Sequence, residues 1–154
     1  MQKKLFWFFI VLGVFGVFYL SWLPQPRLEN YWFMPKWLAK WTDAGVNQNL
    51  RTGVPFLFLG GFIGVWLVNK KKAFKHWILA WFLNVMVVTI AELGQLFVSN
   101  RTCDFGDIMW GAVGAFIGLV FISSVTFIIA IAKTIYTIAK RSPVYYNKSN
   151  PQYI

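Results

Sequence analysis

The chain has 154 residues, of which 58% are hydrophobic, 20% aromatic and only 13% charged. Soluble domains usually have about a quarter of their residues charged, so this composition excludes an ordinary soluble domain and predicts a membrane protein. The net charge of +10 also suits a nucleic-acid partner, but most of the excess lies beside apolar stretches, where it orients helices and meets anionic lipid headgroups. We therefore expect membrane lipid, and no nucleic acid, as a partner.

Four apolar stretches approach or reach the roughly 20 residues that a helix needs to cross a bilayer. They predict an all-α fold with four transmembrane helices, at about residues 5–23, 50–69, 77–98 and 107–132. The first stretch is longer than the roughly 7 to 15 apolar residues of a secretory signal, and "SWLPQP" offers no small-x-small cleavage site, so we expect a retained helix. A membrane domain over residues 1–133 would precede a basic, loosely ordered tail over residues 134–154.

Basic residues predict the orientation of these helices. They gather at the N-terminus, between helices two and three, and after helix four, namely at Lys3 and Lys4, in the "KKKAFK" run at 70–75, and at Lys133, Lys140 and Arg141. By the positive-inside rule these segments are cytoplasmic. Both termini are then inside, and the loops at 24–52 and 98–107 face outward.

The first outer loop contains a stretch with helical periodicity, "ENYWFMPKWLAKWTDAG". It predicts a short helix after Pro35 that would lie in the membrane interface with its apolar face down. Its apolar and basic faces would be formed by Trp37, Leu38 and Trp41, and by Lys36 and Lys40. Such a helix either anchors the loop at headgroup level or covers whatever the outer face binds.

Spaced glycines mark helices two and four. Gly60-x-x-x-Gly64 and Gly114-x-x-x-Gly118 are small-x-x-x-small pairs, which let helix backbones approach closely in lipid. We expect these two helices to pack through the glycines, either within the chain or between copies.

Ionised residues concentrate in "AELGQLFVSNRTCDFGDIMW", residues 91–110, although the surrounding chain is strongly apolar. Glu92 and Gln95 are three residues apart, which places both on the same side of helix three near its outer end. Arg101 follows in a short loop, and Asp104 and Asp107 lie at or just before the start of helix four. A carboxylate inside an apolar segment is costly unless it faces protein or water and is paired, so we expect these side chains to form one cluster at the outer surface.

The same residues also allow a purely structural interpretation. An aspartate at 104 or 107 would be a suitable N-cap for helix four, and acids are favoured in a first helical turn. Arg101 could serve only to neutralise Glu92 and hold a helical hairpin closed. This alternative explains Glu92 together with Gln95 less well, because a hairpin does not need a carboxylate inside the membrane.

The pattern Glu92-x-x-Gln95, Arg101-x-x-Asp104-x-x-Asp107 and Gly114-x-x-x-Gly118 resembles the signature of the VanZ-like family of small bacterial membrane proteins. "QNLRTGVPFLFLGGFIG", residues 48–64, is similar to an earlier block of that family, although Gly111 stands where the family commonly has asparagine. The family is named for a member associated with resistance to the glycopeptide teicoplanin. The resemblance implies a multi-pass protein of the bacterial cytoplasmic membrane with an envelope role, its polar cluster facing the periplasm or exterior.

Two hypotheses follow. In the first, the cluster, with Arg51 from the start of helix two, binds a lipid-linked glycan, a phosphate headgroup or a cell-wall precursor. The arginines would contact anionic groups, Glu92 could accept a proton, and the two aspartates could position a hard cation such as Mg²⁺.

No nucleophile of recognised spacing accompanies the cluster. The sequence therefore gives no specific support for an enzyme, and enzymatic activity is left open. The single cysteine, Cys103, offers neither an internal disulfide nor a metal-ligand spacing, and no cofactor or metal site is predicted. In the second hypothesis the protein is an accessory subunit that packs against a larger membrane complex or forms a homo-oligomer through its glycine faces, with the charged cluster as an interhelical latch.

Overall fold

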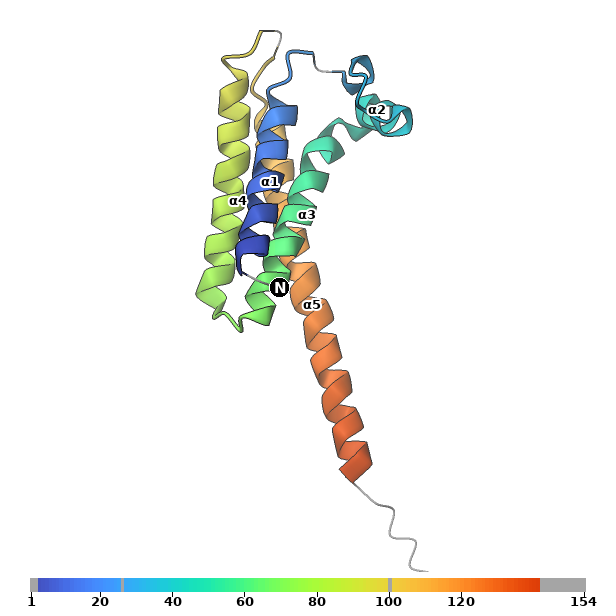
Figure 1. The fold of residues 1–154 in the computed structure, drawn as a ribbon, viewed down its shortest axis with the longest axis vertical. Coiled ribbons are helices and arrows are strands. Elements are labelled where there is room, and N and C mark those ends of the chain that lie inside the picture. Colours follow the sequence, from blue (N-terminus) through green and yellow to red (C-terminus); the bar gives the residue numbers. More distant parts are fainter. Residues whose placement is uncertain (1–2, 26, 100, 142–154) are drawn as a thin grey trace, which may run out of the picture. The chain divides into compact units, whose positions relative to one another are not determined.

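A computed structural model of the chain describes residues 3–25, 27–99 and 101–141. Within these residues every regular element is helical. The long helices are α1 (Lys3–Ser21), α3 (Gln48–Asn69), α4 (Phe74–Gln95) and α5 (Phe105–Arg141). The short helix α2 (Lys36–Asp43) and two 3₁₀ turns, η1 (Leu28–Asn30) and η2 (Gly45–Asn47), connect α1 to α3 (Figure 1).

The four long helices are each long and apolar enough to cross a membrane, which confirms the predicted all-α fold with four spans. The short helix after Pro35 is present as α2, but its place in the membrane interface and the inward orientation of both termini remain predictions. The chain divides into two compact units, residues 1–123 and 124–154. The fold of the first unit positions all the predicted site residues.

Helix α5 extends beyond its predicted end. It continues to Arg141, so residues 134–141, which the sequence analysis assigned to the tail, are helical. The physical reason is that "KTIYTIAKR" contains no helix breaker before Pro143. Within the second unit, Thr134 and Thr137 each donate a hydroxyl hydrogen bond to the carbonyl four residues earlier. The rest of the predicted tail, residues 142–154, lies outside the described residues.

Glycines bring α3 and the first part of α5 into close contact, as their spacing predicts. A Cβ added at Gly60 would overlap the carbonyl oxygen of Ala115, and one added at Gly114 or Gly118 would overlap a carbonyl of α3, from Gly53 or Leu57 respectively. In lipid, where hydrophobic burial supplies little attraction between helices, such backbone proximity is a main source of packing energy.

Helix α4 packs by one side only. Its buried residues recur at helical spacing, at Ala80, Asn84, Val88, Ala91, Glu92 and Gln95. Its other side exposes large apolar side chains such as Ile78, Phe82 and Leu93, as expected for a surface that meets lipid. The buried side becomes polar toward the C-terminal end of α4, and that end carries the predicted site.

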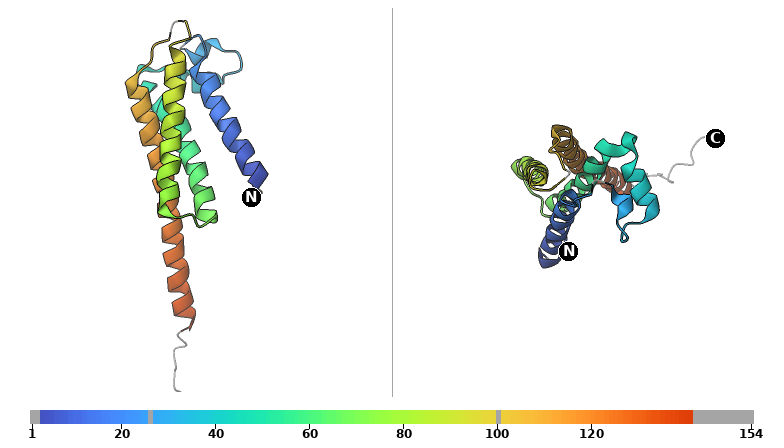
Figure 2. Two further views of the ribbon diagram at one scale, coloured as in Figure 1. Left: turned by 90° about the vertical axis from the view of Figure 1, so that its left-hand side faces the viewer. Right: turned by 90° about the horizontal axis from the view of Figure 1, so that it is seen from above.

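Helix α1 is held at both of its ends. Near its C-terminal end the indole N–H of Trp22 donates to the carbonyl oxygen of Ala91 on α4 at 3.0 Å. Near its N-terminal end Phe6 stacks on Phe62 and Trp66 of α3, with ring centroids 5.3 and 5.1 Å apart. Figure 2 shows α1 inclined to the other helices of its unit. Its middle part packs through Ile10, Val14 and Val17 against the buried cluster that contains Phe56 and Leu59.

The loop that contains α2 lies at the end of the bundle where α1 and α4 end and α3 and α5 begin (Figure 1), and this end is called the α2 end below. The carboxylate of Asp43 holds the loop together, because it accepts hydrogen bonds from the backbone N–H groups of Leu28 and Glu29 at 3.0 and 2.9 Å. Leu28 and Ala39 are buried with Leu23 in a small apolar cluster.

Candidate functional site

A cavity of about 690 Å³ lies at the α2 end and extends between α1 and α3. It is within the range of about 300–1,000 Å³ that ligand pockets usually have. Most of its wall is apolar and comes from α1, α2 and α3. Polar side chains line only the α2 end, namely Ser21, Thr42, Arg51, Thr52, Glu92, Gln95 and Asp107.

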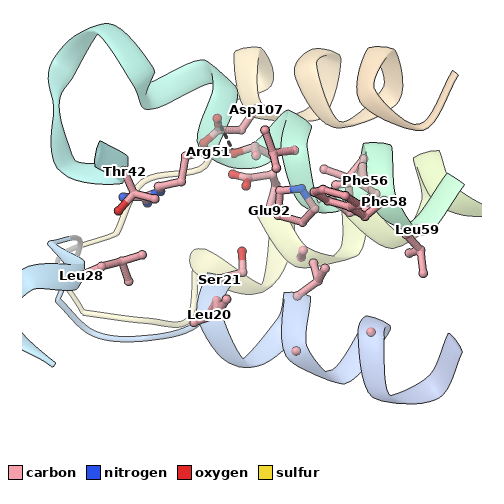
Figure 3. Close-up of a pocket in the computed structure, with 18 of the residues that line it drawn as sticks. Leu20, Ser21, Leu28, Thr42, Arg51, Phe56, Phe58, Leu59, Glu92 and Asp107 are labelled. Carbon is pink, nitrogen blue, oxygen red and sulfur yellow. Dashed lines mark hydrogen bonds between the residues drawn. The ribbon is translucent and has the colours of Figure 1, made fainter. Parts of the chain in front are cut away.

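These polar residues come from every helix of the first unit. Figure 3 shows the side chain of Arg51 of α3 extending toward Thr42 of α2, while Glu92 of α4, Asp107 of α5 and Ser21 of α1 line the same cavity. Four of the six residues selected from the sequence, Arg51, Glu92, Gln95 and Asp107, therefore lie on one cavity wall. The other two, Arg101 and Asp104, are placed differently.

Glu92 and Gln95 act as a pair. Both are buried, with only 2% and 6% of their surfaces exposed. The side-chain amide of Gln95 donates to Oε1 of Glu92 at 2.8 Å and also to the hydroxyl of Ser21 at 3.0 Å. The other carboxylate oxygen, Oε2, accepts from the backbone N–H of Asp104 at 3.4 Å. A buried carboxylate needs such donors, because an unsatisfied charge in an apolar environment is costly.

Asp107 joins α5 to α3. Its Oδ1 accepts a hydrogen bond from the hydroxyl of Thr52 at 2.8 Å. Arg51, the residue before Thr52, is half-buried and lies on the cavity wall. Pro55 lies inside α3 and has no N–H with which to bond the Arg51 carbonyl four residues earlier, so the helix is locally weakened just where it contributes these side chains.

Arg101 is not among the residues that line the cavity. Its Nε donates to the carbonyl oxygen of Leu23 at 3.0 Å, which ties the α4–α5 loop to the end of α1. Within the described part of the chain it forms no ion pair with Glu92, so the direct pairing considered from the sequence is not formed. One terminal nitrogen of the guanidinium is buried without a hydrogen-bond partner. Burial lowers the pKa of the Arg101 guanidinium, and the positive charge of Arg51 lowers it further.

Asp104 is the N-cap of α5. Its Oδ1 accepts from the backbone N–H of Gly106 at 2.7 Å, as the structural interpretation of this residue predicted. Asp107 lies in the first turn of the same helix. Because one oxygen of each aspartate is already occupied by a protein donor, the two do not present a ready pair of cation ligands. Among the described residues, no three His, Cys, Asp or Glu side chains gather into a metal site.

The arrangement can now be compared with known proteins. A protein-family model described as VanZ/LLP1 matches residues 6–130, which include α3, α4, most of α1 and α5, and every site residue named above. The chain belongs to the VanZ/LLP1 family. No curated protein and no solved structure matches the chain significantly. The family match and the four apolar helices together make this a multi-pass membrane protein.

One departure from the usual VanZ-like pattern has a packing explanation. At Gly111 an added Cβ would lie 2.7 Å from Cγ2 of Val88 and 3.2 Å from Cδ2 of Phe56. The asparagine that VanZ-like proteins commonly have at this position would therefore not fit without movement of the buried residues around it. In this VanZ/LLP1 chain the position serves close packing of α3, α4 and α5.

Sequence reasoning missed three hydroxyl residues of the cavity wall in this VanZ/LLP1 protein: Ser21, Thr42 and Thr52. Thr52 follows Arg51 directly and lies 55 residues from its partner Asp107, and local spacing cannot reveal such a contact. Ser21 offers a weak signal, because it is a polar residue at the end of an otherwise apolar span. Thr42 offers none, since threonine is common in short exposed helices.

Proposed function

We propose that this VanZ/LLP1 protein binds a polar or anionic ligand of the bacterial cell envelope at the α2 end, through Arg51, Glu92, Gln95 and Asp107. The class of ligand is a lipid-linked glycan, a phosphate headgroup or a cell-wall precursor. The observation that carries the proposal is the cavity of about 690 Å³, whose polar residues are confined to one end and come from α1, α2, α3, α4 and α5.

The hydrogen bonds at the polar end favour an anionic group over a cationic one. The oxygens of Glu92, Oδ1 of Asp104 and Oδ1 of Asp107 already accept protein donors. A guanidinium has five N–H donors, and at Arg101 one terminal nitrogen has no acceptor. On the cavity wall the cation is Arg51, and phosphate and carboxylate groups are the usual partners of arginine.

The six predicted residues take different roles in this proposal. Arg51 contacts the ligand, and Glu92 with Gln95 shapes the wall beside it. Arg101 is a positioning residue that fixes the α4–α5 loop through Leu23. Asp104 begins α5, and Asp107 joins α5 to Thr52 of α3 at the cavity wall. By the distribution of basic residues, the α2 end faces outward across the cytoplasmic membrane, toward the periplasm or exterior.

The accessory-subunit hypothesis is supported by a different observation. Every carboxylate of the cluster is engaged with another part of the chain, as in Gln95 to Glu92 and Thr52 to Asp107. These hydrogen bonds are sufficient for an interhelical latch. A test of the proposed function must therefore show that a variant can lose ligand binding while it stays folded.

The test compares Arg51→Gln with Arg27→Gln in protein purified in mild detergent. Arg27 is a suitable control, because it is an exposed arginine of the same end, 3.6 Å from the carboxylate of Glu29. An anionic lipid such as phosphatidylglycerol should raise the unfolding temperature of the wild type and of Arg27→Gln more than the zwitterionic lipid phosphatidylcholine does.

In Arg51→Gln the difference between the two lipids should disappear while the unliganded protein stays folded. A difference that persists in Arg51→Gln contradicts the proposed site. If Arg51→Gln is instead destabilised without ligand and co-purifies less with other membrane proteins, the latch interpretation is favoured.

A further inference from the structure

The apolar part of the cavity is a groove between α1 and α3 that ends inside the membrane span. Phe9 of α1 and Phe62 of α3 line its inner end, and their ring centroids are 6.0 Å apart. Below them Phe6 stacks on the same Phe62 at 5.3 Å. The groove is therefore closed at this end by aromatic contacts between the two helices.

The length of the groove matches one leaflet of a bilayer. From Arg51 at the polar end to Phe62 at the closed end, α3 advances by about 16 Å at roughly 1.5 Å per residue. The hydrocarbon core of a bilayer is about 30 Å thick, so the groove reaches to about its middle. A transmembrane helix from another chain would have to continue past the closed end, whereas a lipid chain of one leaflet would stop there.

The groove is accessible from the side and has room for an occupant. The side chains of Phe9 and Phe58 line it and are 44% and 69% exposed, so it is not sealed from surrounding lipid. Gly13 and Gly16 form part of the α1 wall. A Cβ added at Gly16 would meet no atom within 4 Å, unlike the glycines that hold α3 against α5.

From these features we infer that the groove takes one hydrocarbon chain of a lipid with a phosphate-type anionic headgroup, which enters between α1 and α3 from the leaflet at the α2 end. The headgroup lies at Arg51, so the inference rests on the proposed function. A chain that is already in lipid gains little from entering an apolar groove. Selectivity therefore comes from the headgroup, and the groove determines where the chain runs.

The test measures the binding of two labelled probes, dodecyl phosphate and dodecanol, to the full chain in phosphatidylcholine nanodiscs. Gly16→Phe fills the groove, and Leu12→Phe is the matched control, because Leu12 lies on the same helix, is 55% exposed and does not line the cavity. The wild type and Leu12→Phe should bind dodecyl phosphate in preference to dodecanol. Gly16→Phe should bind dodecyl phosphate about ten-fold more weakly or worse, because the phenyl ring would occupy the space of the hydrocarbon chain.

Failure of the groove and failure of the headgroup site give different results. If Gly16→Phe binds dodecyl phosphate as well as the wild type does, with the preference over dodecanol intact, the groove is refuted while the proposed function stands. If the wild type binds both probes equally and Gly16→Phe binds neither, the groove exists but the anion site does not. If a second copy of the chain occupies the groove, the wild type excludes both probes, and Gly16→Cys in a Cys103→Ser background forms disulfide-linked dimers.

A second measurement needs no substitution, and so holds even if Gly16→Phe fails to fold. Dodecyl phosphate with a photoreactive diazirine at its chain end should label wild-type protein near Phe9 and Phe62, where the groove ends. Labelling spread over exposed side chains outside the groove, such as Phe82 of α4 and Phe116 of α5, would show that the chain stays in bulk lipid and would overturn the inference.

Discussion

The hydroxyl of Thr52 donates a hydrogen bond of 2.8 Å to Oδ1 of Asp107, and this contact joins the beginning of α3 to the beginning of α5 at the polar end of the cavity. The two residues are far apart in the sequence, and both are half-buried. Because Asp107 is half-buried, water can only partly replace the Thr52 hydroxyl as its hydrogen-bond donor, and the stability of the bundle should depend on this contact.

Thr52→Val tests this dependence with little change in side-chain shape. Leaving a partly buried acceptor without its partner costs about 1–3 kcal/mol, so the variant should unfold at a lower temperature in detergent than the wild type. Thr89→Val is the control, because the Thr89 hydroxyl donates only within its own helix, to the Val85 carbonyl at 2.8 Å. Equal destabilisation by both substitutions would mean that the Thr52–Asp107 hydrogen bond contributes no more to stability than a hydroxyl bond within one helix.

The glycines of α3 and α5 should differ in their tolerance of alanine. A Cβ at Gly118 would overlap the Leu57 carbonyl and lie 2.7 Å from the Gly61 nitrogen, whereas a Cβ at Gly61 would come no closer than 3.8 Å to another residue. Gly118→Ala should therefore destabilise the bundle by about 1–3 kcal/mol, as overpacking does. Gly61→Ala should be neutral or stabilising, because alanine favours a helix over glycine by about 1 kcal/mol.

Unfolding in mixed detergent micelles would measure both glycine variants. If Gly118→Ala proves as stable as Gly61→Ala, α3 and α5 are not packed as closely in the membrane as described above.

The parts of the molecule that follow local rules could be predicted from the sequence. Apolar length predicts the four spans, and glycine spacing predicts the close contact of α3 with α5. The sequence allowed either Asp104 or Asp107 as the cap of this helix, and the structure shows that Asp104, directly before Phe105, takes that role. The roles of Thr52 and Arg101 could not be predicted, because their partners Asp107 and Leu23 are set by how helices distant in the sequence meet. The groove is also invisible in the sequence, because its walls come from α1 and α3 and their separation depends on contacts between residues far apart in the chain, such as Trp22 with Ala91 and Phe6 with Phe62.

Asp43 should control the order of the loop at the α2 end without affecting the bundle. Its two carboxylate oxygens accept from the N–H groups of Leu28 and Glu29. Asp43→Asn replaces one oxygen with an NH₂ group that cannot accept, so hydrogen exchange at one of these two amides should accelerate by about ten-fold for each ~1.4 kcal/mol lost.

Arg27→Gln is the control for this loop, because it breaks only an exposed ion pair of 3.6 Å, and such pairs contribute about 1 kcal/mol or less. Exchange at Leu28 and Glu29 should stay slow in that variant. Unchanged exchange in Asp43→Asn would show that the carboxylate does not hold the loop.

The orientation in the membrane can be tested with the single cysteine of the chain. Cys103 lies in the loop between α4 and α5 and is partly exposed, and the positive-inside rule places this loop outside the cell membrane. A membrane-impermeant maleimide should therefore label Cys103 in intact cells whose outer layers admit the reagent. In a Cys103→Ser background, Lys70→Cys places a thiol in the basic turn between α3 and α4, and this thiol should react only after the membrane is permeabilised. The reverse pattern would place the α2 end, and with it the polar end of the cavity, in the cytoplasm and would contradict the predicted orientation.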